Sequence, residues 1–279
     1  MRVLKPFIGA AAAIGMALVA NAGAVDGTQQ PSPQSVLETV VERGTLRVGL
    51  ATFVPWAMRD RNGDLIGFEV DVAKKLAGDM GVRVEFVPTA WEGIIQALVA
   101  GRFDIIISGM SITPERALVV DFTRPYASSG YILLASSEQA DRKGLTTLEA
   151  FDAPGITITA RRGSTCAAAM REHFPKATLV YFDDDTLAYR EAASGGVDAI
   201  CSTPPEAAFE IERHGAALRV VSPEPMSPTR EAFAIRKGDP EALTFFNRWI
   251  REQEASGWLR ARHDYWFTTR EWADMVGTD

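Results

Sequence analysis

Arg116 is placed well to hold an anion, because it follows a short loop that leaves a buried strand. An apolar run at residues 105–107 is typical of a parallel strand, and the loop after it contains Gly109, Met110 and Ser111. Thr113 then resembles a helix N-cap, and Pro114 suits the first helical position. Small residues let a ligand approach the backbone, and a guanidinium offers a planar fork for a carboxylate. The stretch predicts a carboxylate site, although an ordinary strand–loop–helix with a surface arginine has the same residue types.

A second polar group, Ser164 and Thr165, stands where a predicted strand ends and a predicted helix begins. The free N–H groups of a helix start can receive an anion. Ser164 is equally suited to capping its own helix. Both interpretations stay open from the sequence.

Thr203 and Glu206 form a third group, separated by two prolines. Thr-x-x-Glu with proline at the first helical position is the pattern of a capping box, in which both side chains serve the helix backbone. Since Glu206 lies one turn along from Thr203, both side chains are alternatively placed to meet a ligand. The sequence slightly favours capping for Glu206 and is neutral for Thr203.

Other chemistries find little support in the sequence. No Gly-x-Ser-x-Gly elbow and no phosphate-binding loop occur, and the acidic run at residues 183–185 is more typical of a helix start than of a metal site. Cys166 and Cys201, the only cysteines, and three scattered histidines have no metal-ligand spacing, so we expect no metal and no cofactor. The two cysteines can form a disulfide in an exported chain or remain as buried thiols.

The N-terminus and the composition indicate an exported globular protein. Arg2 and Lys5 precede an apolar run at residues 7–20, and two small-x-small sites end at Ala22 and Ala24. This is the pattern of a cleaved signal peptide over residues 1–24, and no cysteine follows for a lipid anchor. The net charge of −7 and the absence of a basic patch argue against nucleic-acid binding. We expect a periplasmic monomer.

Strands and helices alternate along the rest of the chain, which predicts a mostly parallel α/β arrangement. Strands are expected at residues 45–50, 82–87, 105–107, 131–136, 156–160, 178–182, 199–201, 218–221 and 231–235. Helices are expected at residues 35–43, after Glu69 as far as Gly81, from Trp91 to Gly101, from Ser164, Asp184 and Pro204, and at residues 239–257 and 258–267. The Pro-rich stretch at residues 222–229 is expected to be a loop.

Three segments resemble the family 3 extracellular solute-binding proteins, the receptors of polar amino-acid ABC importers. They are Gly44–Gly49, Gly63–Asp71 and Trp91–Asp104, and the order and spacing hold from about residue 40 to 270. The resemblance implies a type II periplasmic-binding-protein fold, with two α/β lobes joined by a two-stranded hinge. Lobe 1 would contain residues 40–133 and 233–279, and lobe 2 would contain residues 134–232. The implied partners are a small polar solute with a carboxylate and an inner-membrane ABC permease.

The resemblance also implies which residues bind. Arg116 would hold the ligand carboxylate, Phe53 would cover the ligand, and Thr165 would meet it from the second lobe. Trp91 would line the same wall or serve only as core packing. The full expected set is Phe53, Trp91, Gly109, Met110, Ser111, Arg116, Ser164, Thr165, Thr203 and Glu206.

The sequence departs from the family at Thr203, where amino-acid receptors carry an aspartate for the ligand's ammonium group. A buried ammonium without a counter-charge is costly. Either Glu206 supplies the missing charge, or the ligand is a carboxylate without an α-amino group. Arg161 or Arg162, at the end of the neighbouring strand, would favour a second negative group.

Periplasmic cyclohexadienyl dehydratase, an enzyme that shares this fold, offers an alternative. Its threonine and its catalytic glutamate fall at Ser202 and Glu206 here, and that glutamate protonates the leaving hydroxyl of prephenate or arogenate. The sequence lacks the enzyme's aspartate between these residues, and Arg161 replaces its asparagine. A non-enzymatic receptor is therefore the favoured prediction.

Overall fold

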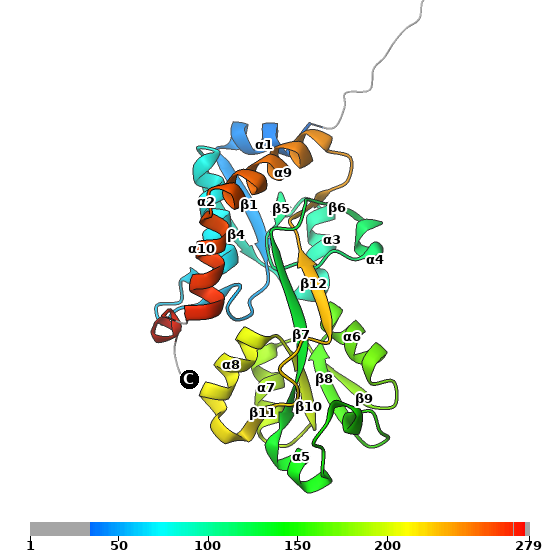
Figure 1. Ribbon diagram of the computed structural model, residues 1–279. Helices are drawn as coiled ribbons and strands as arrows, with labels where there is room; N and C mark the ends of the chain where they lie inside the picture. Colours follow the sequence, from blue (N-terminus) through cyan, green and yellow to red (C-terminus); the bar gives the residue numbers. More distant parts are fainter. Residues whose placement is uncertain (1–33, 270, 277–279) are drawn as a thin grey trace, which may run out of the picture. The chain divides into compact units, whose positions relative to one another are not determined.

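The computed structural model describes residues 34–269 and 271–276, which form two β-sheets with helices packed against them (Figure 1). The predicted signal peptide lies outside the described residues. We call the part built on the first sheet the first lobe and the part built on the second sheet the second lobe. Within the described residues, no helix combines the length and the apolar character needed to cross a membrane.

The first sheet has the strand order β4-β1-β5-β13-β6. β1 (Thr45–Leu50) runs parallel to β4 (Arg83–Pro88) and to β5 (Ile105–Ile106). β13 (Ala234–Arg236) runs antiparallel to its neighbours β5 and β6 (Val120–Phe122). The carboxyl ends of the parallel strands β1 and β5 therefore lie at one edge of the sheet, where both lead into loops with candidate ligand residues.

The first lobe has six α-helices among the described residues. They are α1 (Val36–Arg43), α2 (Phe68–Asp79), α3 (Ile94–Val99), α4 (Pro114–Ala117), α9 (Pro240–Ala255) and α10 (Trp258–Asp264). A short hairpin of β2 (Met58–Arg59) and β3 (Leu65–Ile66) lies between β1 and α2. Short helical turns occur at η1 (Trp91–Gly93), η4 (Tyr265–Thr269) and η5 (Ala273–Met275). Ser35 caps α1, since its side chain accepts a hydrogen bond from Leu37 N.

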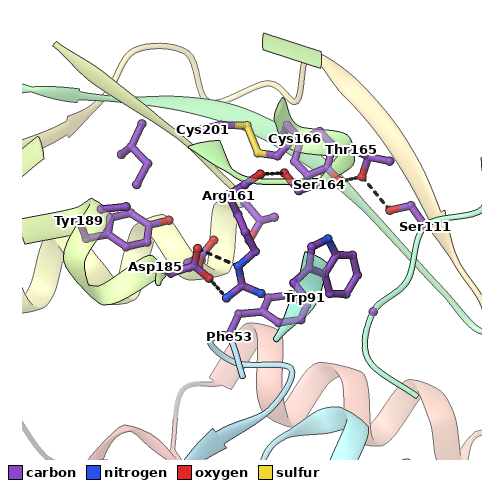
Figure 2. Close-up of a pocket in the computed structure, with 16 residues that line it drawn as sticks. Phe53, Trp91, Ser111, Arg161, Ser164, Thr165, Cys166, Asp185, Tyr189 and Cys201 are labelled. Atoms are coloured by element: carbon purple, nitrogen blue, oxygen red, sulfur yellow. Dashed lines mark hydrogen bonds and ion pairs between the residues drawn. A yellow bond between two sulfur atoms is a disulfide. The ribbon is translucent and has the colours of Figure 1, made fainter. Parts of the chain in front are cut away.

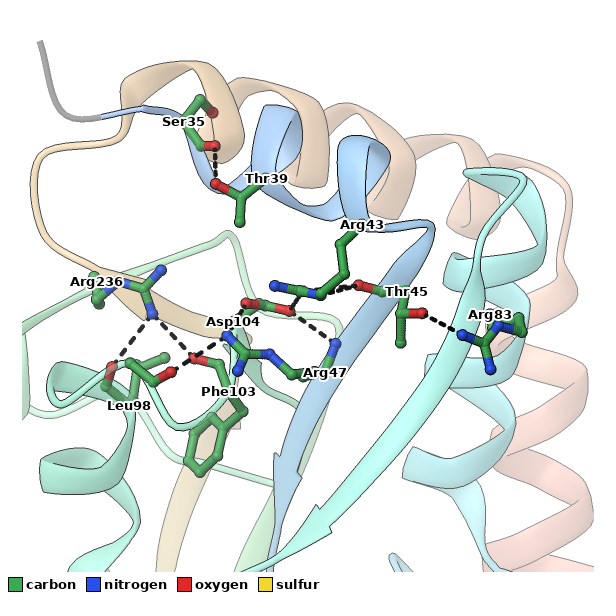
Figure 3. Close-up of polar contacts among 11 residues, drawn as sticks. Ser35, Thr39, Arg43, Thr45, Arg47, Arg83, Leu98, Phe103, Asp104 and Arg236 are labelled. Atoms are coloured by element: carbon green, nitrogen blue, oxygen red, sulfur yellow. Dashed lines mark hydrogen bonds and ion pairs between the residues drawn. The ribbon is translucent and has the colours of Figure 1, made fainter. Parts of the chain in front are cut away.

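Asp104 fixes the start of β5 against β1 (Figure 3). Its side chain is almost completely buried and accepts from Arg47 N (2.8 Å) and Arg47 Nη2 (2.9 Å), and it also pairs with Arg43 at the end of α1. A buried carboxylate with two guanidinium partners and a backbone N–H donor is well satisfied. The network therefore holds in place the strand that carries the Gly109–Ser111 loop.

The second sheet has the strand order β11-β7-β10-β8-β9. Its strands are β7 (Ala127–Ser136), β8 (Thr157–Arg161), β9 (Thr178–Phe182), β10 (Ala199–Ser202) and β11 (Leu218–Val220). Its helices are α5 (Ser137–Lys143), α6 (Thr165–His173), α7 (Asp185–Ala193) and α8 (Pro204–His214), with short turns η2 (Leu148–Phe151) and η3 (Gly215–Ala217). Strands β8, β9 and β10 are parallel, so their carboxyl ends open toward the starts of α6, α7 and α8.

Two antiparallel strands connect the lobes, as expected for a two-stranded hinge. The first half of β7 pairs with β12 (Ser227–Glu231), and its second half pairs with β10 and β11 (Figure 1). The prediction of one return strand at residues 231–235 after a Pro-rich loop was wrong, because β12 and β13 are separate strands. Proline is tolerated in an edge strand, where its missing N–H breaks no ladder bond, and so Pro228 did not prevent β12 from forming.

Candidate ligand site

A cavity of about 90 Å³ lies between the two lobes (Figure 2). The first lobe contributes Phe53, Trp91, Gly109 and Ser111. The hinge strand β7 contributes Tyr131, and the second lobe contributes Arg161, Ser164, Thr165, Cys166, Asp185, Ala188, Tyr189, Ile200, Cys201, Thr203 and Glu206. Eight of the ten residues expected from the sequence therefore line this cavity; Met110 and Arg116 do not.

A cluster of three hydroxyl groups joins the lobes at one side of the cavity. Thr165 Oγ1 lies 3.2 Å from Ser111 Oγ and also hydrogen-bonds to the Tyr131 hydroxyl. Burial is the main reason that the pKa of Tyr131 is raised, so this phenol stays protonated and can donate. Three hydroxyls that bond mainly to one another can reorient toward the oxygens of an entering anion.

Arg116 lies directly behind this cluster. Its Nη1 donates to the Ser111 carbonyl (2.8 Å), its Nη2 donates to the Gly163 carbonyl (3.2 Å), and its guanidinium lies 5.3 Å from the centre of the Trp91 ring. Thr113 caps α4 as expected by accepting from Arg116 N. Burial lowers the pKa of the Arg116 guanidinium from its usual value. The Arg116 guanidinium is thus turned inward, but Ser111 separates it from the cavity.

Gly109 and Met110 have different positions in the loop after β5. Gly109 lines the cavity with a φ of 55°, and a Cβ atom there would lie 2.8 Å from Phe53 Cζ and 3.1 Å from Trp56 Cε3. Only glycine fits such a left-handed and crowded position. The Met110 side chain packs into the hydrophobic core of the first lobe instead, and Trp56 is also a core residue.

Arg161 forms an ion pair with Asp185, and both side chains line the cavity (Figure 2). Arg161 Nε lies 3.1 Å from Asp185 Oδ1, and Nη2 contacts the other carboxylate oxygen. The same Nη2 donates to the Thr52 carbonyl across the cleft (2.8 Å), and the guanidinium lies 5.4 Å from the centre of the Phe53 ring. The sequence offered Arg161 as a candidate, but identified Asp185 only as part of an acidic helix start.

Glu206 faces the cavity instead of capping α8. Thr203 occupies the N-cap position, but its side chain makes no capping hydrogen bond, and its buried Oγ1 has no hydrogen-bond partner. Burial, and secondarily the charge of Asp185, raises the pKa of Glu206 to about 8, although Arg161 and a hydrogen bond with Tyr189 act in the opposite direction. The capping-box prediction was therefore wrong, because the carboxyl lies among cavity side chains rather than at the helix backbone.

Ser164 and the two cysteines hold the second-lobe wall together. Ser164 caps α6 by accepting from Ala167 N (3.1 Å), and it also lines the cavity, so both open interpretations of its position are compatible with the structure. Cys166 and Cys201 form a disulfide with a Cα–Cα distance of 6.1 Å. The bond ties the first turn of α6 to β10, and thereby holds Thr165 in place relative to the start of α8.

Four hydrogen bonds join the lobes around the cavity. Besides the Ser111–Thr165 contact and the bond from Arg161 to Thr52, the Gly163 carbonyl accepts from both Trp91 Nε1 and Arg116 Nη2, each at 3.2 Å. Across residues 34–269 and 271–276, no group of three or more His, Cys, Asp or Glu side chains could hold a metal ion. The arrangement is suited to enclosing a small polar molecule.

Two α/β lobes that have a small cavity between them and are joined by two strands define a solute-binding protein of the type II periplasmic fold. The sequence matches the model of the bacterial extracellular solute-binding proteins, family 3, over residues 46–269. The chain belongs to this family, and the predicted fold class is confirmed.

Similar proteins include both receptors and an enzyme. The chain is 31% identical over 235 residues to the L-cystine-binding protein TcyJ of Escherichia coli (strain K12), covering 84% of this chain and 86% of that protein. It is 29% identical over 238 residues to a cyclohexadienyl dehydratase of Pseudomonas aeruginosa, covering 85% and 88% of the two chains.

Solved structures give the same picture. The crystal structure of the ancestral amino acid-binding protein AncCDT-1, described as a precursor of cyclohexadienyl dehydratase, aligns with a TM-score of 0.77 and 39% identity, covering 84% of this chain and all of that one. A putative ABC-transporter binding component of Wolinella succinogenes complexed with lysine aligns with a TM-score of 0.77 and 33% identity, covering 83% and 99%.

Proposed function

We propose that this chain is the periplasmic receptor of an ABC importer and that it binds an α-amino acid between its lobes, which comprise residues 40–133 with 233–279 and residues 134–232. The observation that carries the proposal is the buried Glu206 carboxyl in the cavity wall, which supplies the negative group that Thr203 lacks. The relatives named as amino-acid receptors support the same class of ligand.

The two ends of an amino acid would meet different walls. The carboxylate would lie against Ser111 and Thr165, with Arg116 behind them, since charge-assisted hydrogen bonds favour an anion there. The ammonium group would lie near Glu206, which lines the same cavity and interacts with Tyr189 and Asp185. Since residues of both lobes line the cavity, ligand binding would favour the closed state.

The test is a thermal-shift and calorimetric screen of α-amino acids against the same molecules without the amino group. Ligand binding to the folded state raises its melting temperature. We expect amino acids to bind and their des-amino counterparts to bind about 10- to 100-fold more weakly, since a charge-assisted hydrogen bond contributes roughly 1.5–3 kcal/mol. Glu206→Gln should remove this preference, and Arg116→Ala should abolish measurable binding.

Glu210→Gln is the matched control, because Glu210 lies one turn further along α8 and does not line the cavity of about 90 Å³. This variant should retain the wild-type preference. Equal affinity of the wild-type protein for both ligand series would exclude a role of Glu206 as the partner of an ammonium group. Undiminished binding by Arg116→Ala would exclude the proposed carboxylate site.

A cyclohexadienyl dehydratase activity is the second candidate, and the pKa of Glu206 favours it. A carboxyl with a pKa of about 8 carries a proton at neutral pH, as a general acid must when it protonates a leaving hydroxyl. The 29% identical relative supports this candidate. Turnover of prephenate, followed by the loss of its absorbance and abolished in Glu206→Gln, would establish the enzyme; absence of turnover with tight amino-acid binding would establish the receptor.

A further inference from the structure

A second, larger cavity lies on the other side of Arg161. It has a volume of about 450 Å³, compared with about 90 Å³ for the inner cavity. Six residues line both cavities and therefore form the wall between them, namely Phe53, Trp91, Arg161, Asp185, Tyr189 and Glu206. The inner cavity contains the hydroxyl groups of Ser111 and Thr165, whereas the outer cavity contains neither.

Arg161 is the long charged side chain of this wall, and it is held at three points. Asp185 binds its guanidinium from the second lobe, the Thr52 carbonyl accepts from it in the first lobe at 2.8 Å, and the Phe53 ring lies beneath it at 5.4 Å. Only 14% of the Arg161 side chain and 25% of the Asp185 side chain are exposed. A side chain with partners on both sides of the cleft closes the passage between the cavities.

The inner volume limits the ligand. At about 90 Å³ it is much smaller than the outer cavity of about 450 Å³, and Arg161 lies in the wall between the two. A side chain of only a few atoms remains possible while Arg161 stays in place.

We propose that Arg161, positioned by Asp185, is the specificity-determining residue that restricts this site to amino acids with short side chains. The inference rests on the proposed function and names the substrate class of the same site. A longer side chain would have to displace the guanidinium from Thr52 and enter the outer cavity. That cavity is lined by both acidic side chains (Asp183, Asp184, Glu210) and basic ones (Arg59, Arg213), so a polar or charged end of a longer ligand would find a partner there.

The experiment measures affinity by calorimetry for a series of straight-chain α-amino acids of increasing length, from alanine through norvaline and norleucine to lysine. We expect wild-type affinity to fall at least tenfold along the series. Arg161→Ala should bind norleucine and lysine at least tenfold more tightly than wild type does, while its alanine affinity stays equal or falls. Asp185→Asn, which keeps Arg161 but loosens it, should show a smaller change in the same direction.

Arg162→Ala is the matched control, because Arg162 is the adjacent arginine but pairs with Asp183 and lies over Tyr181 outside the inner cavity. Its length profile should equal that of wild type. Wild-type protein that binds lysine as tightly as alanine, or an Arg161→Ala variant that weakens all lengths by the same factor, would overturn the proposal.

A parallel series of straight-chain carboxylates without amino groups separates the two proposals. If wild type binds these but no amino acids, the amino-acid function fails, and the length limit is still read from the carboxylate series. If neither Arg161→Ala nor Asp185→Asn changes how affinity depends on chain length in either series, Arg161 does not set the length limit, whatever the ligand class. Circular dichroism at the assay temperature checks that each variant is folded.

Discussion

The backbone N–H of Gly109 donates a 2.7 Å hydrogen bond to Oε1 of Glu69, a fully buried carboxyl in the first turn of α2. The Tyr126 hydroxyl donates to the same oxygen, while Glu69 Oε2 is buried without a hydrogen-bond partner. Burial raises the pKa of Glu69 to about 8, so the loop below the cavity rests on a carboxyl that holds its proton near neutral pH. Glu69 is thus one of the buried carboxyls through which pH should act on the stability of the protein.

The first prediction concerns stability and pH. The pKa values of Glu69 and Glu206 are raised to about 8, and those of Glu210 and Glu231 to about 7, in each case mainly by burial. In this range the folded state holds more protons than the unfolded state, so the free energy of unfolding should fall as the pH rises from about 4.5 to about 8. Urea unfolding at several pH values measures this slope.

Glu69→Gln is the control for this slope. The amide keeps an oxygen that can accept from Gly109 and Tyr126, but it does not titrate, so the decline in stability should become shallower. Stability that rises between pH 5 and pH 8 in the wild-type protein would contradict the burial of these carboxyls.

The second prediction concerns ligand binding and pH. An ammonium group beside Glu206 should lower the pKa of this carboxyl and release its proton, so amino-acid affinity should increase between pH 6 and pH 8. Calorimetry at pH 7 in two buffers with different ionisation enthalpies should detect the release of about one proton. Glu206→Gln should show no release. A dehydratase would behave in the opposite way, because its activity should decline as the pH rises through about 8 and the acid loses its proton.

The third prediction concerns the disulfide. Cys166 and Cys201 are 35 positions apart in the sequence, and closing a loop of this size should stabilise the fold by about 3–4 kcal/mol. A reductant should therefore lower the denaturant midpoint, and ligand affinity should fall because the bond positions Thr165 relative to Thr203. The double variant Cys166→Ser with Cys201→Ser should be as unstable as the reduced protein and indifferent to reductant. Equal stability with and without reductant would refute the stabilising role.

The fourth prediction concerns Gly109. A Cβ atom there would displace Phe53, so Gly109→Ala should weaken ligand binding at least tenfold and also reduce stability. Gly101→Ala is the control, because Gly101 also has a positive φ (72°) but open space around it. The control should lose only about 1–2 kcal/mol of stability from backbone strain and keep its affinity. If both variants bind normally, the close packing of Phe53 on the loop has no part in binding.

Much of the fold could be predicted from the sequence, since strand and helix periodicities are local signals. Thr178–Phe182 matched β9 to the residue, and the helices predicted from Ser164 and Asp184 begin one residue later, with these two residues as their N-caps. The hinge was harder, because β12 is a polar edge strand that contains Pro228 and lacks an apolar alternation. Its pairing with β7 is a tertiary relationship that no local pattern records.

The site was predicted less completely, for a similar reason. A capping box and a buried acid share the spacing of Thr203 and Glu206, and only the surrounding Tyr189 and Asp185 distinguish them. The role of Asp185 depends on its contact with Arg161, 24 positions away, and so it was missed. The sequence did contain a useful signal, because Arg161 stands where the related enzyme has an asparagine. A buried arginine needs a nearby acidic partner.

Two of the bridging side chains, Arg116 and Trp91, meet on one peptide oxygen at Gly163, and a third, Arg161, ends on the peptide oxygen of Thr52. Every amino acid brings such an oxygen, so exchanging the residue at either position leaves the acceptor itself intact. The backbone acceptors of these hydrogen bonds between the lobes can therefore be retained in evolution while the side chains around the bound ligand change. Recognition and closing motion become separable in evolution, which suits a scaffold whose kin include both a receptor and an enzyme.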